Sequence, residues 1–209
     1  MNVDNITINT QSSIKLFLSK IIYFDPFKID LETSDADIIF ITHDHYDHMD
    51  VDSINKVKND STIVVAPKSM EGVIRKIEFK DYIYLEPNEE TNIGDINIKT
   101  IPAYNILKPF HPRKNNWLGY IVTINDVSYY VAGDTDKTKE AENVKCDVAL
   151  VPIGGHFTMD VNEAAELIKE INPKVVIPTH YGSIVGNKSD GLKLKEKLSK
   201  TNIEVGLKL

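Results

Sequence analysis

The amino-acid sequence predicts an α/β fold, a four-layer αββα sandwich in which two mixed β-sheets pack together between helices. Two observations favour this architecture. Short β-rich runs come in two blocks along the chain, and stretches with helical spacing accompany each block. At 209 residues, the chain also has a length that one hydrophobic core can serve, so we expect a single domain over residues 1–209. The order of elements alone would equally fit a generic α/β fold.

The first block consists of short runs rich in β-branched and aromatic residues, each bounded by polar residues or proline. We expect strands over residues 13–18, 20–24, 37–42 and 62–66. Two stretches with helical spacing, residues 50–57 and 69–77, lie on either side of the last of these strands. The first block therefore predicts three strands followed by a helix, a strand and a helix.

The second block has the same character and contains two further helical stretches. We expect strands over residues 96–101, 118–124, 127–132, 148–152, 175–178 and 203–207. Asn125-Asp126 is a plausible hairpin turn between two of them. A helix should begin at Asp160, because Asp160 and Glu163 have the spacing of a capping box, and Pro173 prevents its continuation. A last amphipathic stretch covers residues 192–198.

The composition is that of an ordinary globular protein, with 42% hydrophobic and 26% charged residues. The net charge of -7 argues against a nucleic-acid partner, because neutralising phosphates requires clustered Lys and Arg. No stretch approaches the roughly 18 apolar residues of a membrane span, and residues 1–10 lack the segments of a signal peptide. We therefore expect a cytoplasmic protein with no membrane partner, and its oligomeric state stays open. Because Cys146 is the only cysteine, any metal must have nitrogen and oxygen ligands.

Three of the six histidines lie within residues 43–48, directly after an apolar run that we expect to be a strand. The end of a strand has a fixed position in its sheet. The following turn can then aim His43 and His45 to one side and Asp47 and His48 to another. Imidazole and carboxylate are ligands of zinc, iron and manganese, so the pattern predicts up to two adjacent metal sites.

Residues 43–48 have the sequence His-Asp-His-Tyr-Asp-His, and by this H-x-H-x-D-H signature the chain resembles the metallo-β-lactamase superfamily. Within it, the chain is similar to the small single-domain hydrolases of the ascorbate-6-phosphate-lactonase-like branch. Three further segments match the family's strand ends: residues 24–26 (Phe-Asp-Pro), 133–136 (Gly-Asp-Thr-Asp) and 178–182 (Pro-Thr-His-Tyr-Gly). The resemblance spans almost the whole chain and implies the αββα fold with an active site at the sheet edges.

The resemblance also implies which residues bind metal and how two ions share them. The expected ligands are His43 and His45 for the first ion, Asp47, His48 and His180 for the second, and Asp134 as a bridge between them. The expected cofactor is Zn²⁺, as one or two ions, with Mn²⁺ or Fe²⁺ as alternatives.

At one position the chain departs from the family's pattern. The family usually supplies a further histidine to the first ion at the end of a strand, where this chain has Asn105. The first site could therefore bind its metal loosely, Asn105 could ligate through its amide oxygen, or His111 could reach in from six residues later. An amide oxygen is a weaker zinc ligand than imidazole, so we expect the second site to be the tighter one. Oxygen-rich ligation would suit manganese or iron.

Two further features could contribute to substrate handling. His156 lies in a glycine-containing turn before the capped helix and could line the pocket as a substrate contact or proton donor. The loop over residues 104–117 is locally basic, with Lys108, His111, Arg113 and Lys114. These charges could orient a phosphate or carboxylate of the substrate, although a charge run is more often solvated surface.

These observations predict a hydrolase that uses a metal-bound hydroxide. Asp47 would orient the nucleophile, Asp134 would hold both ions, and a water or a nearby histidine would protonate the leaving group. We expect a small ester, lactone or phosphodiester as substrate. It should be anionic, because two divalent ions make the pocket positive despite the chain's charge of -7. The alternative is a metal-dependent binding or sensor module of the same fold without turnover.

Overall fold

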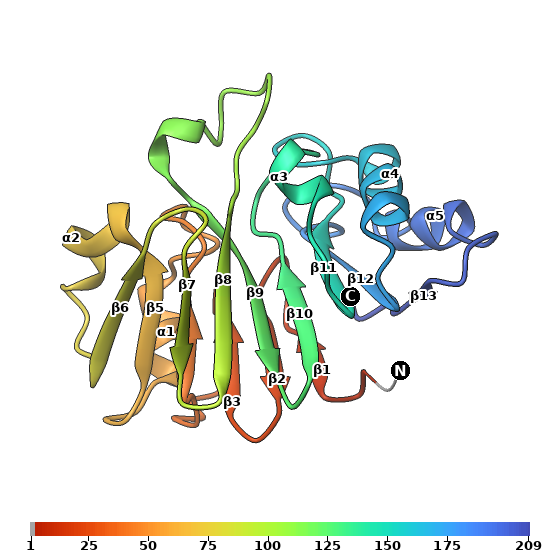
Figure 1. Cartoon of the computed structure of the whole chain (residues 1–209). Helices are drawn as coiled ribbons and strands as arrows, with labels where there is room; N and C mark the ends of the chain where they lie inside the picture. Colours follow the sequence, from red (N-terminus) through yellow and green to blue (C-terminus); the bar gives the residue numbers. More distant parts are fainter. Residues whose placement is uncertain (1–2) are drawn as a thin grey trace.

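The computed structural model describes residues 3–209 and contains two β-sheets that lie face to face (Figure 1). The first sheet has the strand order β1-β2-β3-β4-β5-β6. Its strands are β1 (Ile6–Ile8), β2 (Ile14–Phe17), β3 (Ile21–Phe24), β4 (Ile38–Phe40), β5 (Ile63–Pro67) and β6 (Asp81–Leu85). The sheet is mixed, because β1, β2 and β3 pair antiparallel whereas β3 through β6 pair parallel.

The second sheet has the strand order β13-β12-β11-β10-β9-β8-β7 and is also mixed. Its strands are β7 (Glu90–Ile93), β8 (Ile96–Pro102), β9 (Leu118–Ile124), β10 (Val127–Val131), β11 (Val148–Pro152), β12 (Val175–Thr179) and β13 (Glu204–Val205). Asn125 and Asp126 form the predicted hairpin turn between β9 and β10, with positive φ values of 51° and 60°. Positive φ at both central residues is what a type I′ turn requires.

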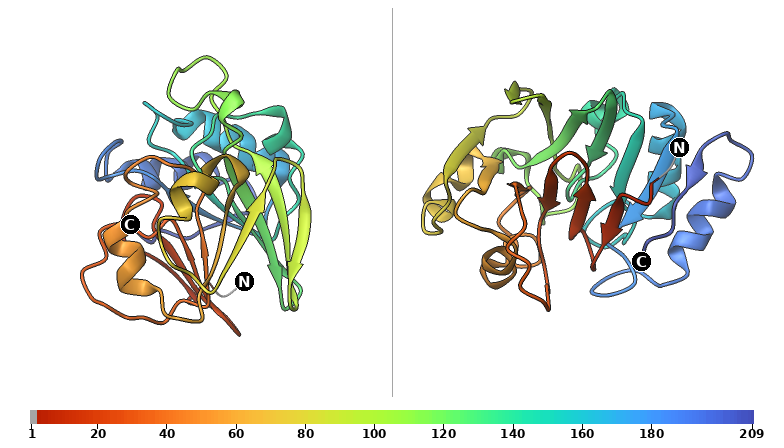
Figure 2. Two further views of the ribbon diagram at one scale, coloured as in Figure 1. Left: turned by 90° about the vertical axis from the view of Figure 1, so that its left-hand side faces the viewer. Right: turned by 90° about the horizontal axis from the view of Figure 1, so that it is seen from below.

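Helices cover the outer face of each sheet (Figure 2). The helices α1 (Val51–Val57) and α2 (Glu71–Ile74) pack on the first sheet, with a 3₁₀ turn at Lys68–Met70 before α2. The helices α3 (Lys139–Glu142), α4 (Val161–Ile171) and α5 (Asp190–Lys197) pack on the second sheet. A further 3₁₀ turn, Arg113–Asn115, lies in the loop between β8 and β9. Within residues 3–209, no helix combines the length and apolarity needed to cross a bilayer.

Strand side chains alternate between a central core and two outer cores. In β4, Phe40 points into the space between the sheets, whereas Ile39 points toward the layer of α1 and α2. Phe40 stacks on Phe24 of β3 with ring centroids 4.7 Å apart. From the second sheet, the Tyr120 hydroxyl donates to the carbonyl of Ile41 at 2.7 Å. The two sheets are therefore joined by apolar packing and by a hydrogen bond just beyond the end of β4.

The predicted αββα sandwich is confirmed, but several elements were not predicted. These are β1, β6, β7 and α3. Most side chains of β6 and β7 are at least partly exposed, and β7 (Glu-Thr-Asn-Ile) has no apolar run. The helix predicted over residues 69–77 is instead a 3₁₀ turn followed by one α-helical turn. Gly72 lies within it, and glycine is a weak helix former.

The capping box predicted at the start of α4 is present. Asp160 Oδ1 accepts from the backbone nitrogens of Asn162 and Glu163 at 2.7 and 2.9 Å, and Glu163 Oε2 accepts from Asp160 N at 2.9 Å. The helix ends at Asn172, which has a φ of 48° and precedes Pro173. These bonds fix the point at which the chain leaves the turn after β11 and enters α4.

Asp147 links three strands where β11 begins. Its Oδ2 accepts from Ser128 N and Ser128 Oγ at 3.0 and 2.8 Å, and its Oδ1 lies 2.7 Å from Lys174 Nζ. Lys174 and the Ser128 backbone lower the pKa of Asp147 from 3.8 to about 2. Because the folded chain holds this carboxylate ionised more strongly than the unfolded chain does, Asp147 stabilises the fold above about pH 4. That contribution is lost as the pH falls toward 2.

We predict that Asp147→Ala lowers the free energy of unfolding by about 1 kcal/mol near neutral pH, because Ser128 and Lys174 lose their acceptor. The measurement is urea denaturation, repeated as the pH is lowered from about 7 to about 3. The difference from wild type should shrink below about pH 4. Asp30→Ala, at an exposed aspartate, is the matched control and should change stability by less than about 0.5 kcal/mol. A difference that stays constant over this pH range would contradict the assignment.

Candidate metal centre

Parallel strands of both sheets deliver polar residues to one edge of the sandwich. His43 follows β4, Asp134 follows β10 and His180 follows β12. The carboxyl ends of parallel strands meet at the same edge of a sheet. The two sheets also join at this edge, because Leu118 N donates to the Thr42 carbonyl at 3.1 Å. The side chains that follow the strands of both sheets therefore converge.

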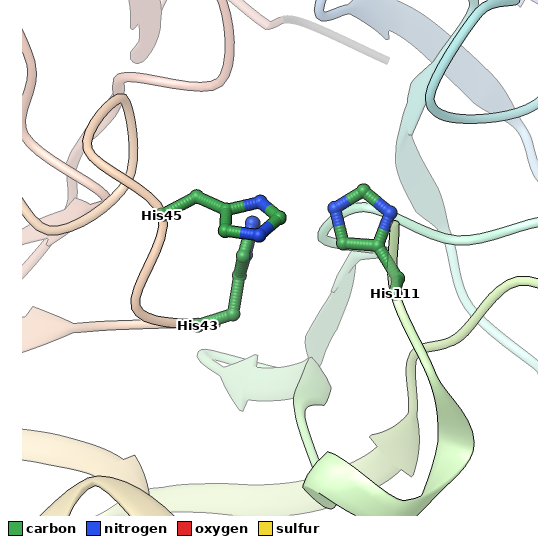
Figure 3. Close-up of side chains that lie close together, drawn as sticks. All are labelled: His43, His45 and His111. Atoms are coloured by element: carbon green, nitrogen blue, oxygen red, sulfur yellow. The ribbon is translucent and has the colours of Figure 1, made fainter. Parts of the chain in front are cut away.

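His43, His45 and His111 form the first cluster of candidate ligands, and their rings lie close together (Figure 3). One ring nitrogen from each lies within 4.8 Å of the others. His43 and His45 come from the turn after β4, whereas His111 comes from the loop between β8 and β9. Trp117 packs against all three, with ring centroids 4.9 Å from His43 and His45 and 5.6 Å from His111. This packing restricts the orientation of the imidazoles.

Asp47, His48 and His180 form the second cluster, and Asp134 lies between the two clusters. Asp134 Oδ1 is 3.4 Å from His48 Nε2. Asp134 Oδ2 is 3.2 Å from His180 Nε2 and 3.4 Å from His111 Nε2. A single carboxylate therefore contacts both clusters, as a bridging ligand must.

These contacts have the spacing of metal ligands. Two atoms that each lie about 2.1 Å from one ion are roughly 3.4 Å apart in tetrahedral coordination. Several buried atoms of the clusters have no hydrogen-bond partner within residues 3–209: Nε2 of His43, His48 and His111, both ring nitrogens of His180, and Oδ1 of Asp134. Buried polar atoms are normally hydrogen-bonded, and a cation would satisfy these unpaired atoms, which face one another. The residues present therefore fit a metal centre.

The protonation states of the clusters also fit a metal centre. Burial raises the pKa of Asp134, but His180 and His48 outweigh it and hold that pKa well below its ordinary value. Burial and the nearby His48 hold the pKa of His43 well below its ordinary value. At neutral pH, Asp134 is therefore an anion and His43 a neutral imidazole, the forms that bind metal. Burial lowers the pKa of His48, but Asp134 and Asp25 raise it well above its ordinary value, so metal binding there should release a proton.

A hydrogen-bond network behind the ligands sets the orientation of two rings. Asp25, fully buried after β3, has its Oδ2 2.7 Å from His48 Nδ1 and accepts from Thr42 Oγ1 at 2.6 Å. Because the Thr42 hydroxyl gives its proton to Asp25, its oxygen accepts from His43 Nδ1 at 2.9 Å. Both Nδ1 atoms therefore carry the proton, which leaves both Nε2 atoms available to a metal.

Asn105 supports His111, and its amide is fully engaged within the protein. Its Oδ1 accepts from His111 N at 3.0 Å and lies 3.0 Å from His111 Nδ1. Its Nδ2 donates to Asp136 Oδ1 at 3.0 Å and to the Phe157 carbonyl at 2.9 Å. Lys108 Nζ completes the network 2.6 Å from Asp136 Oδ1. Of the three alternatives left open by the sequence, this geometry favours His111 as the third residue of the first cluster, and it does not favour ligation by Asn105.

A cavity of about 250 Å³ lies beside the clusters. The candidate ligands that border it are His45, Asp47, His111, Asp134 and His180. Its other walls are the side chains of Tyr46, Phe110, Phe157 and Ile184. A substrate can therefore reach the ligand atoms while mostly apolar groups surround the rest of it.

The structure places groups considered for substrate handling apart from the cavity lining. His156 is exposed and is not among the residues that line the cavity, and its ring packs against Phe110 and Phe157 with centroids 5.3 and 4.6 Å away. Lys108 and Arg113 each lie 2.6 Å from the carboxylate of an acidic residue. These two basic residues of the loop are therefore paired with carboxylates within the protein.

Several supporting residues received no role from the sequence. Asp25 and Asp136 lie in segments that match the family, and the usable signal was that Asp25 directly follows β3 and that Asp136 lies in the turn after β10. Asp25 and His180 also adopt left-handed backbone conformations, with φ of 45° and 56°. Such conformations are uncommon outside glycine and often occur at functional sites. Thr42 and Phe157 gave no signal, because their roles depend on contacts between segments far apart in the chain.

Comparison with known proteins gives one family match and close sequence relatives. The chain matches a model described as the beta-lactamase superfamily domain over residues 5–181. It is 36% identical over 156 residues to a metal-dependent hydrolase from Pyrococcus horikoshii, in an alignment that covers 71% of this chain and 68% of that protein. The family match over residues 5–181 therefore includes the candidate ligands from His43 to His180.

Solved structures with the same fold cover nearly the whole chain. A proposed metal-dependent hydrolase from Parabacteroides distasonis superposes with a TM-score of 0.82 at 30% sequence identity, covering 98% of this chain and 92% of that one. A metallo hydrolase from Ignicoccus hospitalis has a TM-score of 0.82 at 24% identity, with coverages of 97% and 93%. The second likeness concerns the fold alone.

We predict that Asn105→Ala weakens metal binding at the first cluster by about tenfold to a hundredfold, because His111 loses the oxygen that orients its ring. Competitive zinc titration should show one weakened site and one unchanged site. Asn97→Ala, which removes a half-buried amide of β8 that donates to Glu90 and Asn92, is the matched control and should leave both affinities as they are. Wild-type affinity at both sites of Asn105→Ala would contradict the supporting role.

Proposed function

The chain belongs to the beta-lactamase superfamily and is a metal-dependent hydrolase, and on that premise we propose that it hydrolyses a small ester, lactone or phosphodiester. The observation that carries the proposal is the convergence of unpaired, buried nitrogen and oxygen atoms on either side of Asp134. The same atoms border a cavity large enough for a small molecule. Ligand atoms and a substrate-sized space therefore occur together.

The proposal assigns each ion a set of residues. The first ion would be held by His43, His45 and His111 and the second by Asp47, His48 and His180, with Asp134 available to both. Imidazole nitrogens with carboxylate oxygens favour Zn²⁺, with Mn²⁺ or Fe²⁺ as alternatives. When bound, such ions make water a nucleophile near neutral pH and polarise the bond under attack.

Asp47 and Asp134 have different roles in the proposed reaction. Burial raises the pKa of Asp47, but hydrogen bonding to His180 and the nearby His48 lower it below its ordinary value, so Asp47 is a carboxylate at neutral pH. It borders the cavity and can accept a hydrogen bond from the attacking water, which orients that water toward the substrate. Asp134 holds the two clusters together. Because His156 lies outside the cavity, a water is the better candidate to protonate the leaving group.

A binding or sensor module without turnover is the weaker alternative. It depended on Asn105 standing in place of a histidine and weakening one site. Since His111 completes that cluster and Asn105 holds it in place, the residues for two ions are present. The reason to prefer a module without turnover therefore no longer applies.

We predict that the purified protein binds two divalent ions and hydrolyses at least one of three probes: para-nitrophenyl acetate, a simple lactone or bis(para-nitrophenyl) phosphate. Asp134→Ala should lower kcat/KM by at least about a thousandfold, because it removes the carboxylate shared by both clusters. His156→Ala, at the histidine outside the cavity, is the control and should keep both ions and most of the activity. Metal content is measured by atomic emission.

Two results would contradict the proposal. Two bound ions without hydrolysis of any probe would favour the binding module. A wild-type protein that binds no divalent ion would refute the metal centre itself.

A further inference from the structure

The side chains that surround the metal ligands give the cavity apolar walls. They come from four separate segments, as Tyr46, Phe110, Phe157 and Ile184. Tyr46 follows β4, Phe110 lies between β8 and β9, Phe157 follows β11, and Ile184 follows β12. Among residues 3–209, no lysine or arginine borders the cavity. The part of a substrate that extends beyond the metal ligands therefore contacts aromatic and aliphatic side chains.

The aromatic wall is held in place by the same network that holds His111. Phe110 and Phe157 pack edge to face, with ring centroids 4.7 Å apart. The Phe157 carbonyl accepts from Asn105 Nδ2 at 2.9 Å, and Asn105 Oδ1 accepts from His111 N at 3.0 Å. The wall therefore has a defined position relative to a candidate ligand, as a specificity pocket requires.

Two basic side chains of the loop that carries Phe110 are engaged outside the cavity. Lys108 Nζ lies 2.6 Å from Asp136 Oδ1 and donates to the Thr158 carbonyl at 2.9 Å. Asp136 is only 8% exposed, so turning Lys108 toward a substrate would leave a nearly buried carboxylate without its cation. Arg113 pairs with Glu140 at 2.6 Å. A remote carboxylate or phosphate on a substrate would find no cation here.

From these walls we infer that the site selects substrates whose group next to the scissile bond is uncharged and apolar, either aliphatic or aromatic. The inference rests on the proposed function and names the substrate class of that same site. The cavity of about 250 Å³ is smaller than the roughly 300–1,000 Å³ of pockets for drug-sized ligands, so this group is small, such as a phenyl ring. An apolar group gains by leaving water, whereas a charged one loses its hydration without finding a partner.

This inference narrows the anionic substrate expected from the sequence. A negative charge at the scissile group itself, as in a phosphodiester, would lie beside the metal ions. A second charge elsewhere on the substrate would have to enter a space walled by Phe110, Phe157 and Ile184. The site should therefore reject molecules that carry a carboxylate or phosphate away from the bond that is cut.

Hydroxamates test the inference without depending on the reaction, because the hydroxamate group binds metal and its substituent enters the cavity. Acetohydroxamate, benzohydroxamate and para-carboxybenzohydroxamate differ only in that substituent. Their binding to the metal-loaded protein is measured by isothermal titration calorimetry. Benzohydroxamate should bind at least about tenfold more tightly than acetohydroxamate. The para-carboxy compound should lose most of that gain.

Single phenylalanine variants assign the gain to the cavity walls. Phe110→Ala and Phe157→Ala should each weaken benzohydroxamate binding about fivefold or more and leave acetohydroxamate binding nearly unchanged. The Phe157 variant keeps the backbone carbonyl that accepts from Asn105, so the support of His111 is retained. Phe17→Ala, at an exposed phenylalanine of β2 outside the cavity, is the matched control and should bind all three compounds like wild type.

The results that would contradict this inference differ from those that would contradict the proposed function. Equal binding of the three compounds, tighter binding of the para-carboxy compound, or a full phenyl gain in both cavity variants would overturn the inference and leave the metal centre standing. If none of the compounds binds to protein that carries its metal, the proposed function itself fails, and the inference falls with it.

Discussion

The site is organised around the buried carboxylate of Asp134. This side chain is 4% exposed, and imidazole nitrogens of His48, His111 and His180 lie within 3.4 Å of its two oxygens. An anion removed from water requires a compensating positive charge, and the imidazole nitrogens around Asp134 need a partner for their lone pairs once metal binding has released the His48 proton. A cation between the carboxylate and the nitrogens satisfies both kinds of group at once. The remaining features of the edge hold these nitrogens in position.

The fold positions the ligand nitrogens in two different ways. His43 and His180 follow central parallel strands, so the sheets themselves fix where these side chains begin, and the buried Asp25 and Thr42 set the tautomer of the rings beside them. His111 comes from a loop and has no strand to position it. Its position depends on Asn105, which is hydrogen-bonded in turn to the segments after β10 and β11. The side-chain network therefore fixes the position of the loop ligand itself, whereas at the strand end it only sets the tautomer and orientation of the rings.

The difference explains what the sequence could and could not predict. The strands followed from apolar runs and the first candidate ligands from a dense motif, because both are local in the chain, whereas the αββα sandwich and the ligand roles of Asp134 and His180 were implied by the family resemblance. The choice between Asn105 and His111 was not available from local pattern, since it depends on how a loop folds back over residues far away in sequence. The exposed position of His156 and the pairing of Lys108 with Asp136 are also tertiary facts. The half-exposed edge strands β6 and β7 lack the contrast between faces that pattern analysis detects.

In the proposed reaction, the metal centre would polarise the scissile bond while the aromatic walls select by apolar contact, so reactivity and specificity would come from separate groups. The central claim of this proposal is that two ions share Asp134. The most direct test is a crystal structure of the zinc-loaded protein with anomalous scattering recorded at the zinc edge. We expect two peaks on opposite sides of Asp134, one at the cluster of His43, His45 and His111 and one at the cluster of Asp47, His48 and His180. A single peak, or coordination by Asn105 in place of His111, would contradict this arrangement.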